Sequence, residues 1–278
     1  MWTGVTSARS KGLSQESTLF KPLGRWFFSQ LRYLWNLYKF LVRTIVEIGR
    51  PEGRAIVQKT TMYQIYFTGV DAVWVVSGLA VILGGLIIWQ SLNLLAITTN
   101  EGFLGKVVEL VVIRELGPIM TAFIVIGRSA SSITVELGNM VVDREVQLLR
   151  SMGIAPHRYL VLPRMLGVTS AIFCLCIIFD FVAVLGGFVV ARLAISMPFQ
   201  TFLDVVSTHL TFTDIAVSGL KTAVFGIIIA TVSTYQGLSV QNAVTEVPQA
   251  TRRCVIHSLV MIVVADGIIT AFFFGLAF

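Results

Sequence analysis

The chain has 278 residues, of which 55% are hydrophobic and only 13% are charged, and its formal net charge is +6. An ordinary soluble domain of this length does not need so much apolar surface, so the composition excludes one and indicates an integral membrane protein. The mean hydropathy of +0.83 agrees with this interpretation.

The N-terminal sixty residues are predicted to lie outside the membrane core. Residues 1–21 are polar, lack the apolar centre of a cleavable signal peptide, and are predicted to be flexible. In residues 22–60, polar side chains recur every three or four positions from Arg25 to Arg50, and aromatic and aliphatic side chains cover the remaining surface. This pattern predicts an amphipathic helix on the cytoplasmic leaflet. A sixth span is the alternative, but four charges would then cost roughly 2.5 to 3.5 kcal/mol each.

Five continuous apolar runs follow, and each is close to the ~20 residues that cross a bilayer as a helix. Because the runs do not alternate between apolar and polar residues, helices are favoured over a barrel. The fold class is therefore all-α integral membrane, with the interfacial helix followed by a five-span domain over residues 61–278. The predicted spans are Ala72 to Trp89, Leu116 to Ile133, Met165 to Val190, Ile215 to Tyr235, and Cys254 to Phe278.

The distribution of basic residues predicts the orientation. Ten of the 21 Lys and Arg residues precede the first span, and the loops after the second and fourth spans are also basic, whereas the other two loops carry few. Cytoplasmic segments are enriched in Lys and Arg, so the N-terminus is predicted to be cytoplasmic and the C-terminus periplasmic.

The cytoplasmic loop between spans two and three contains a short predicted helix at residues 143–153. Val146, Leu149 and Met152 share one face, Glu145 and Arg150 lie on others, and Gly153 ends the helix. Such a segment suits docking of a soluble partner, although a helix that merely lies on the surface is an equal alternative.

Four ionisable residues fall inside or beside the apolar runs: Arg128, Glu136, Asp180 and Asp266. Charged groups are costly in the membrane and are usually paired or functional. We interpret them mainly as polar contacts that hold the helices or a dimer together, with a role in transport as the alternative.

Several motifs are absent. The chain has no GxxxxGK[ST] sequence, so it is not expected to hydrolyse ATP, and nothing predicts a nucleic-acid partner. Its three cysteines and three histidines have no spacing typical of disulfides, metal ligands or catalytic groups.

Long stretches of the chain resemble the MlaE/YrbE family of ABC transporter permeases. The resemblance lies in VIRELGPIMTAFIVIGRSASSITVELGNMVV (112–142), EVQLLRSMGIAPHRYLVLPR (145–164), GLKTAVFGIIIATVSTYQG (219–237) and ATRRCVIHSLVMIVVADGIITAFFF (250–274). It implies a homodimeric permease in the bacterial inner membrane, with ATP and Mg²⁺ bound by separate cytoplasmic ATPase subunits. The family also implies MCE-domain proteins in the periplasm and movement of phospholipid between inner and outer membranes. Import of a sterol or another hydrophobic substrate is the family alternative, and a proton-coupled carrier is a different class.

The residues themselves suggest where lipid would bind. Arg114 and Glu115 are predicted at the outer mouth of span two, where a charged pair can meet a headgroup, while Gln90, Leu94 and Leu95 would line a cavity for acyl chains. Simple anchoring of the helix at the interface is the alternative for the charged pair.

Overall fold

The computed structural model describes residues 31–47, 54–98, 102–241 and 243–275, and these residues form helices without any strand. Five helical segments are long and apolar enough to cross a membrane, which confirms the predicted number. The first four extend beyond both ends of their predicted apolar runs, and the fifth begins before its predicted start at Cys254. The segments are Val57–Asn93, Leu104–Val142, His157–Ile195, Phe212–Leu238 and Glu246–Phe273.

Two of the five spans are built from several helical pieces. The first contains α2 (Arg54–Gly69), a 3₁₀ turn η1 (Val70–Ala72) and α3 (Val73–Thr98). The second contains α4 (Gly102–Val107), the π-helix η2 (Val108–Leu116), α5 (Gly117–Val125), a second π-helical turn η3 (Ile126–Ala130) and α6 (Ser131–Val142). The remaining elements are α7 (Glu145–Ser151), η4 (His157–Val161), α8 (Leu162–Ile195), α9 (Phe199–His209), α10 (Phe212–Leu238) and α11 (Glu246–Phe274).

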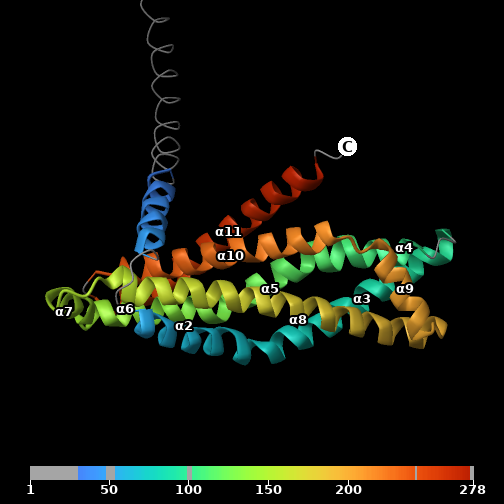
Figure 1. Cartoon of the computed structure of the whole chain (residues 1–278), viewed down its shortest axis with the longest axis horizontal. Coiled ribbons are helices and arrows are strands. Elements are labelled where there is room, and N and C mark those ends of the chain that lie inside the picture. The colour runs from blue at the N-terminus through green and yellow to red at the C-terminus, as the bar shows by residue number, and fades with distance from the viewer. Residues whose placement is uncertain (1–30, 48–53, 99–101, 242, 276–278) are drawn as a thin grey trace, which may run out of the picture.

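The long helices form an elongated bundle in which successive spans run in opposite directions (Figure 1). The short helix α7 lies at one end of the bundle, and α4 and α9 lie at the other. We refer to these as the α7 end and the α9 end. Helix α8 is central, because it packs against α2, α3 and α10.

Close helix packing depends on glycine at the α3–α8 contact. A Cβ atom on Gly84 would overlap the backbone carbonyl of Ala183, and one on Gly186 would lie 2.8 Å from the backbone of Val81. Small residues let membrane helices approach this closely without a hydrophobic driving force.

The helix of residues 31–47 stands at a steep angle to the bundle at its α7 end (Figure 1). It packs against the bundle through one face. The Tyr33 ring stacks on His257 at 4.6 Å between centroids, and Phe40 contacts His157 and Tyr235. The opposite face exposes aromatic and aliphatic side chains, which is the distribution that an interfacial helix would need. The exposed side chains include Leu31, Leu34, Trp35, Tyr38 and Ile45.

The docking of this helix is expected to weaken at high pH. Burial raises the pKa of Tyr33 from 10.0 to about 12. Between these two pH values the phenol of an undocked helix ionises while the docked one stays neutral, so the contribution of Tyr33 to docking is full below pH 10 and is lost as the pH rises toward 12. A spin label at position 46 of this helix and another at position 244, just before α11, would report the distance between the helix and the bundle. Tyr33→Phe should remove the part of the transition that comes from this residue, and an unchanged transition in that variant would contradict the assignment.

Two predictions about the segments between the apolar runs are wrong. Residues 104–116 were expected to be mostly loop, but they form the beginning of the second helical segment, and Arg114 and Glu115 lie ten or more residues from its start. The segment after span three also contains the helix α9, which the sequence pattern did not predict. Both errors arise because polar residues interrupt segments that are nevertheless helical.

Candidate functional site

A cluster of three charged residues from three different spans lies inside the bundle. The side chain of Lys221 on α10 is completely buried, and its ammonium Nζ lies 2.8 Å from Glu115 Oε2 on η2 and 2.8 Å from Asp266 Oδ1 on α11. Thr270, one turn beyond Asp266, donates a hydrogen bond of 3.1 Å to the other carboxylate oxygen of Glu115. We call Lys221, Glu115 and Asp266 the charge cluster.

The local backbone explains why Lys221 fits at this position. Pro118 has no N–H and therefore cannot donate to the carbonyl of Arg114, four residues earlier. Lys221 Nζ donates to this carbonyl at 3.2 Å. The π-helix η2 ends at the same point, where the Gly117 N–H bonds to the Val112 carbonyl. The lysine therefore gives the Arg114 carbonyl a donor that Pro118 cannot supply.

The ammonium thus donates two hydrogen bonds, to a Glu115 carboxylate oxygen and to the Arg114 carbonyl, and forms an ion pair with Asp266. A buried charge is tolerated only when it is paired and hydrogen-bonded, and this arrangement meets both conditions. The cluster contains one positive and two negative groups, so its formal charge is −1. Ionisable groups held within membrane spans are functional-site candidates by default, and this cluster is the most completely buried one described here.

The other residues predicted to bind lipid do not belong to the charge cluster. Arg114 is half-buried on η2, and the carboxylates of Asp214, Glu109 and Glu115 are close enough to interact with its charge. Gln90 is exposed on α3. Leu94 and Leu95 lie near the end of α3, and their side chains are outside the described residues.

Two of the four predicted intramembrane residues pair with residues that the sequence did not suggest. Arg128 forms an ion pair of 3.0 Å with Asp71, which joins span two to span one. Glu136 forms an ion pair of 2.7 Å with the almost completely buried Arg164, which joins span two to span three.

The remaining two residues have different environments. Asp266 belongs to the charge cluster. Asp180 has only a weak contact, in which Cys176 Sγ donates to Oδ2 at 3.7 Å, and its carboxylate packs against Gly117.

The predicted docking helix exists as α7, but its apolar side chains face two directions. Val146 is buried in the bundle and Leu149 is partly buried against the core. Met152 is exposed, together with Leu148 and Ile154, which were not predicted to take part. Glu145 and Arg150 are exposed, and Gly153 ends the segment with a φ of +78°, a conformation that glycine adopts readily.

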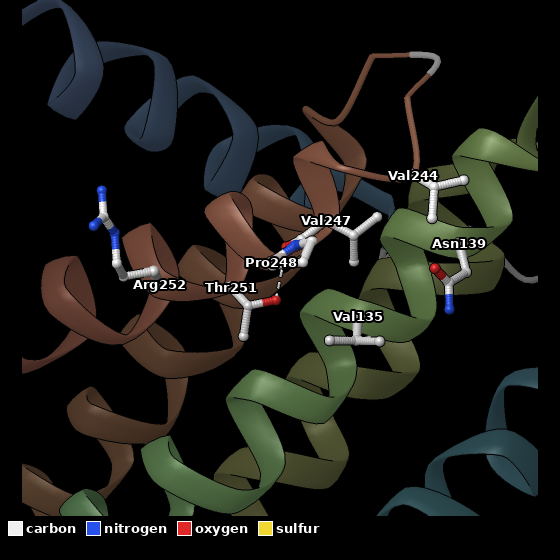
Figure 2. A pocket seen from close by; sticks show the side chains of 7 residues that line it. All are labelled: Val135, Asn139, Val244, Val247, Pro248, Thr251 and Arg252. Atoms are coloured by element: carbon white, nitrogen blue, oxygen red, sulfur yellow. Dashed lines mark hydrogen bonds between the residues drawn. The ribbon is translucent and has the colours of Figure 1, made fainter.

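A shallow groove of about 560 Å³ lies near α7, between α6 and the first turns of α11 (Figure 2). Val135 and Asn139 line it from α6, and Val247 and Thr251 line it from α11. Thr251 donates a 2.9 Å hydrogen bond to the Val247 carbonyl, so its hydroxyl is satisfied within its own helix. The groove contains no residue of the charge cluster.

Sequence reasoning missed Lys221, although one signal could have found it. It is the one Lys or Arg in the apolar run from Ile215 to Tyr235. A lone lysine in such a run requires an acidic partner from another span, and Asp266 and Glu115 were both visible candidates.

Comparison with known proteins agrees with this architecture. Residues 61–272 match the family described as Permease MlaE. A probable ABC transporter permease protein of Rickettsia typhi is 30% identical over 247 residues, covering 89% of this chain and 93% of that protein. The intermembrane phospholipid transport system permease protein MlaE of Haemophilus influenzae is 26% identical, covering 82% of this chain and 87% of that protein.

A plant protein is also similar. The chloroplastic protein TRIGALACTOSYLDIACYLGLYCEROL 1 of Arabidopsis thaliana is 27% identical over 270 residues, covering 97% of this chain and 76% of that protein. The family match extends over all five spans and includes every residue of the charge cluster. The chain therefore belongs to the MlaE family of ABC transporter permeases.

Proposed function

We propose that this chain is the membrane subunit of an ABC transporter that moves phospholipid, or a related lipid, between the inner and outer membranes of a bacterium. Two similar proteins support this proposal by name, one from a phospholipid transport system and one a permease. The observation that carries it is the charge cluster, because it places a buried ammonium beside two carboxylates within a largely apolar membrane bundle. An apolar path with a few fixed charges suits a substrate with acyl chains and a charged headgroup.

The remaining partners follow from the same proposal. The chain would work as a homodimer, with cytoplasmic ATPase subunits that bind ATP and Mg²⁺ and with an MCE-domain protein on the periplasmic side. The least covered span supports dimerisation, because only 17% of the apolar window in Glu246–Phe273 is buried within one chain. Its exposed side chains include Ile256, Val260, Val263, Val264 and Ile268.

The function is tested by reconstituting the permease with its ATPase and MCE-domain partners in phospholipid vesicles. We expect fluorescent phospholipid to move only when ATP is hydrolysed, and dissipation of the proton gradient should leave the rate unchanged. Mass spectrometry of the purified complex should find retained phospholipid. Movement that follows the proton gradient and ignores ATP would instead support a proton-coupled carrier.

The exposed face of α7 provides a separate prediction about the ATPase. Leu148 is 61% exposed and Met152 is 58% exposed, so this face is available to a cytoplasmic partner. Leu148→Glu should reduce ATPase recovery on pull-down by roughly tenfold, the equivalent of 1.4 kcal/mol. Gln147→Glu adds the same charge to the neighbouring exposed position and serves as the control. Equal recovery of ATPase with both variants would show that α7 does not dock it.

A further inference from the structure

A second apolar groove, of about 440 Å³, runs along α8 on the side of α9. The part of α8 that lines it extends from Ile177 to Phe188, with lining residues repeated every three or four positions. Helix α9 forms the facing wall, and no residue of the charge cluster lines the groove. It is therefore a separate feature from the candidate site described above.

The groove has a closed floor and an open side. Phe202, Val206 and Ile113 form the floor, with exposed fractions of 1%, 4% and 7%. Phe181 and Ile177 lie at the opening and are 66% and 56% exposed. Because Ile177 and Phe181 belong to a membrane span, the groove opens toward the hydrocarbon of the bilayer.

The walls offer almost nothing to a polar ligand. Asp180 and Ser207 are the only polar residues among those that line the groove. The Oδ1 atom of Asp180 is buried, and its carboxylate packs against Gly117. Walls of this composition suit an apolar occupant.

The dimensions of the groove match one chain of a lipid. The 11 residue steps from Ile177 to Phe188 correspond to about 17 Å along the axis of α8, at ~1.5 Å per residue. The hydrocarbon of one leaflet is about 15 Å deep, half of the ~30 Å core. Three aromatic rings close the outer end, since Phe188 lies 4.9 Å from Phe199 and 5.6 Å from Phe202 between centroids. The groove is thus confined to the leaflet at the α9 end.

We propose that this groove binds one acyl chain of a membrane lipid drawn from the leaflet at the α9 end. The acyl chain lies along α8 with its terminus near Asp180, and its glycerol end leaves through the open side of the groove. This proposal requires insertion in the membrane but not the transport function proposed above, so the two can fail independently.

The test uses the full-length protein in bilayer discs of phosphatidylethanolamine and phosphatidylglycerol that carry a photoreactive diazirine on one acyl chain. Mass spectrometry after illumination should place the adducts mainly in residues 177–188 and 199–210. Val184→Trp fills the groove from α8 and Leu203→Trp fills it from α9. Each should reduce labelling of these segments by roughly tenfold, the equivalent of 1.4 kcal/mol.

The control is Leu166→Trp, which adds the same bulk to an exposed position of α8 outside the groove. This variant should be labelled like the wild type. Labelling spread evenly over all lipid-facing helices would overturn the proposal, as would unchanged labelling in both groove-filling variants. If a photoreactive amino acid at position 181 captures a partner's membrane helix and not lipid, the groove is a protein interface and the proposal is also wrong.

Discussion

Replacement of Lys221 with methionine should have the largest effect of any single substitution in this chain. The change removes the ammonium that lies between Glu115 and Asp266 and leaves two partly buried carboxylates without it. Removal of one partner from a buried ion pair typically costs about 3 to 5 kcal/mol. We expect a large fall in the thermal unfolding temperature of the purified protein in detergent and loss of lipid transport.

A second variant separates stability from function at this site. The triple change Lys221→Met, Glu115→Gln and Asp266→Asn removes all three charges together, so it should recover much of the lost stability. If the charges serve transport, this stable variant should still be inactive. Wild-type transport by the triple variant would show that the cluster only holds the spans together. Lys106→Met, which changes an exposed lysine, should behave like the wild type in both measurements.

Substitution of Gly84 by alanine should destabilise the α3–α8 contact. The added methyl group would overlap the backbone carbonyl of Ala183, and a backbone atom cannot move aside as the end of a side chain can. Overpacking of this kind costs about 1 to 3 kcal/mol and occasionally more. The unfolding temperature, followed by intrinsic tryptophan fluorescence in detergent, should fall clearly.

Gly78 provides a matched control for this experiment, because it lies on the same helix and a Cβ atom there would meet nothing within 4 Å. Gly78→Ala should leave stability unchanged or raise it slightly, since alanine favours helix over glycine by up to about 1 kcal/mol. Equal destabilisation by the two variants would mean that glycine acts here through helix flexibility and not through close packing.

The five spans could be predicted because the free energy of placing apolar residues in a bilayer accumulates along each run, independently of which helices pack together. The same reasoning shortened the second span. Lys106, Glu109, Arg114 and Glu115 made residues 104–116 resemble a loop, whereas the structure satisfies several of these charges inside the bundle. A hydropathy argument treats each charge as unpaired and therefore ends the helix too early.

The pairing of the charges could not be predicted for a related reason. Glu115 and Lys221 are separated by 106 positions in sequence, and their contact depends on how α10 packs against η2. Arg128 likewise pairs with Asp71 on the first span, a partner far from it in sequence. One sequence shows which residues need partners, but the choice among distant partners is made by helix packing.

The close pairing of Lys221 has a consequence for any anionic substrate. Because the ammonium already donates to Glu115 and to the Arg114 carbonyl and lies 2.8 Å from Asp266, an incoming phosphate would compete with these groups for it. Binding would then be an exchange of one anion for another, with nearly equal numbers of contacts before and after. An exchange of this kind holds its cargo weakly, and the displaced carboxylate remains nearby to expel it.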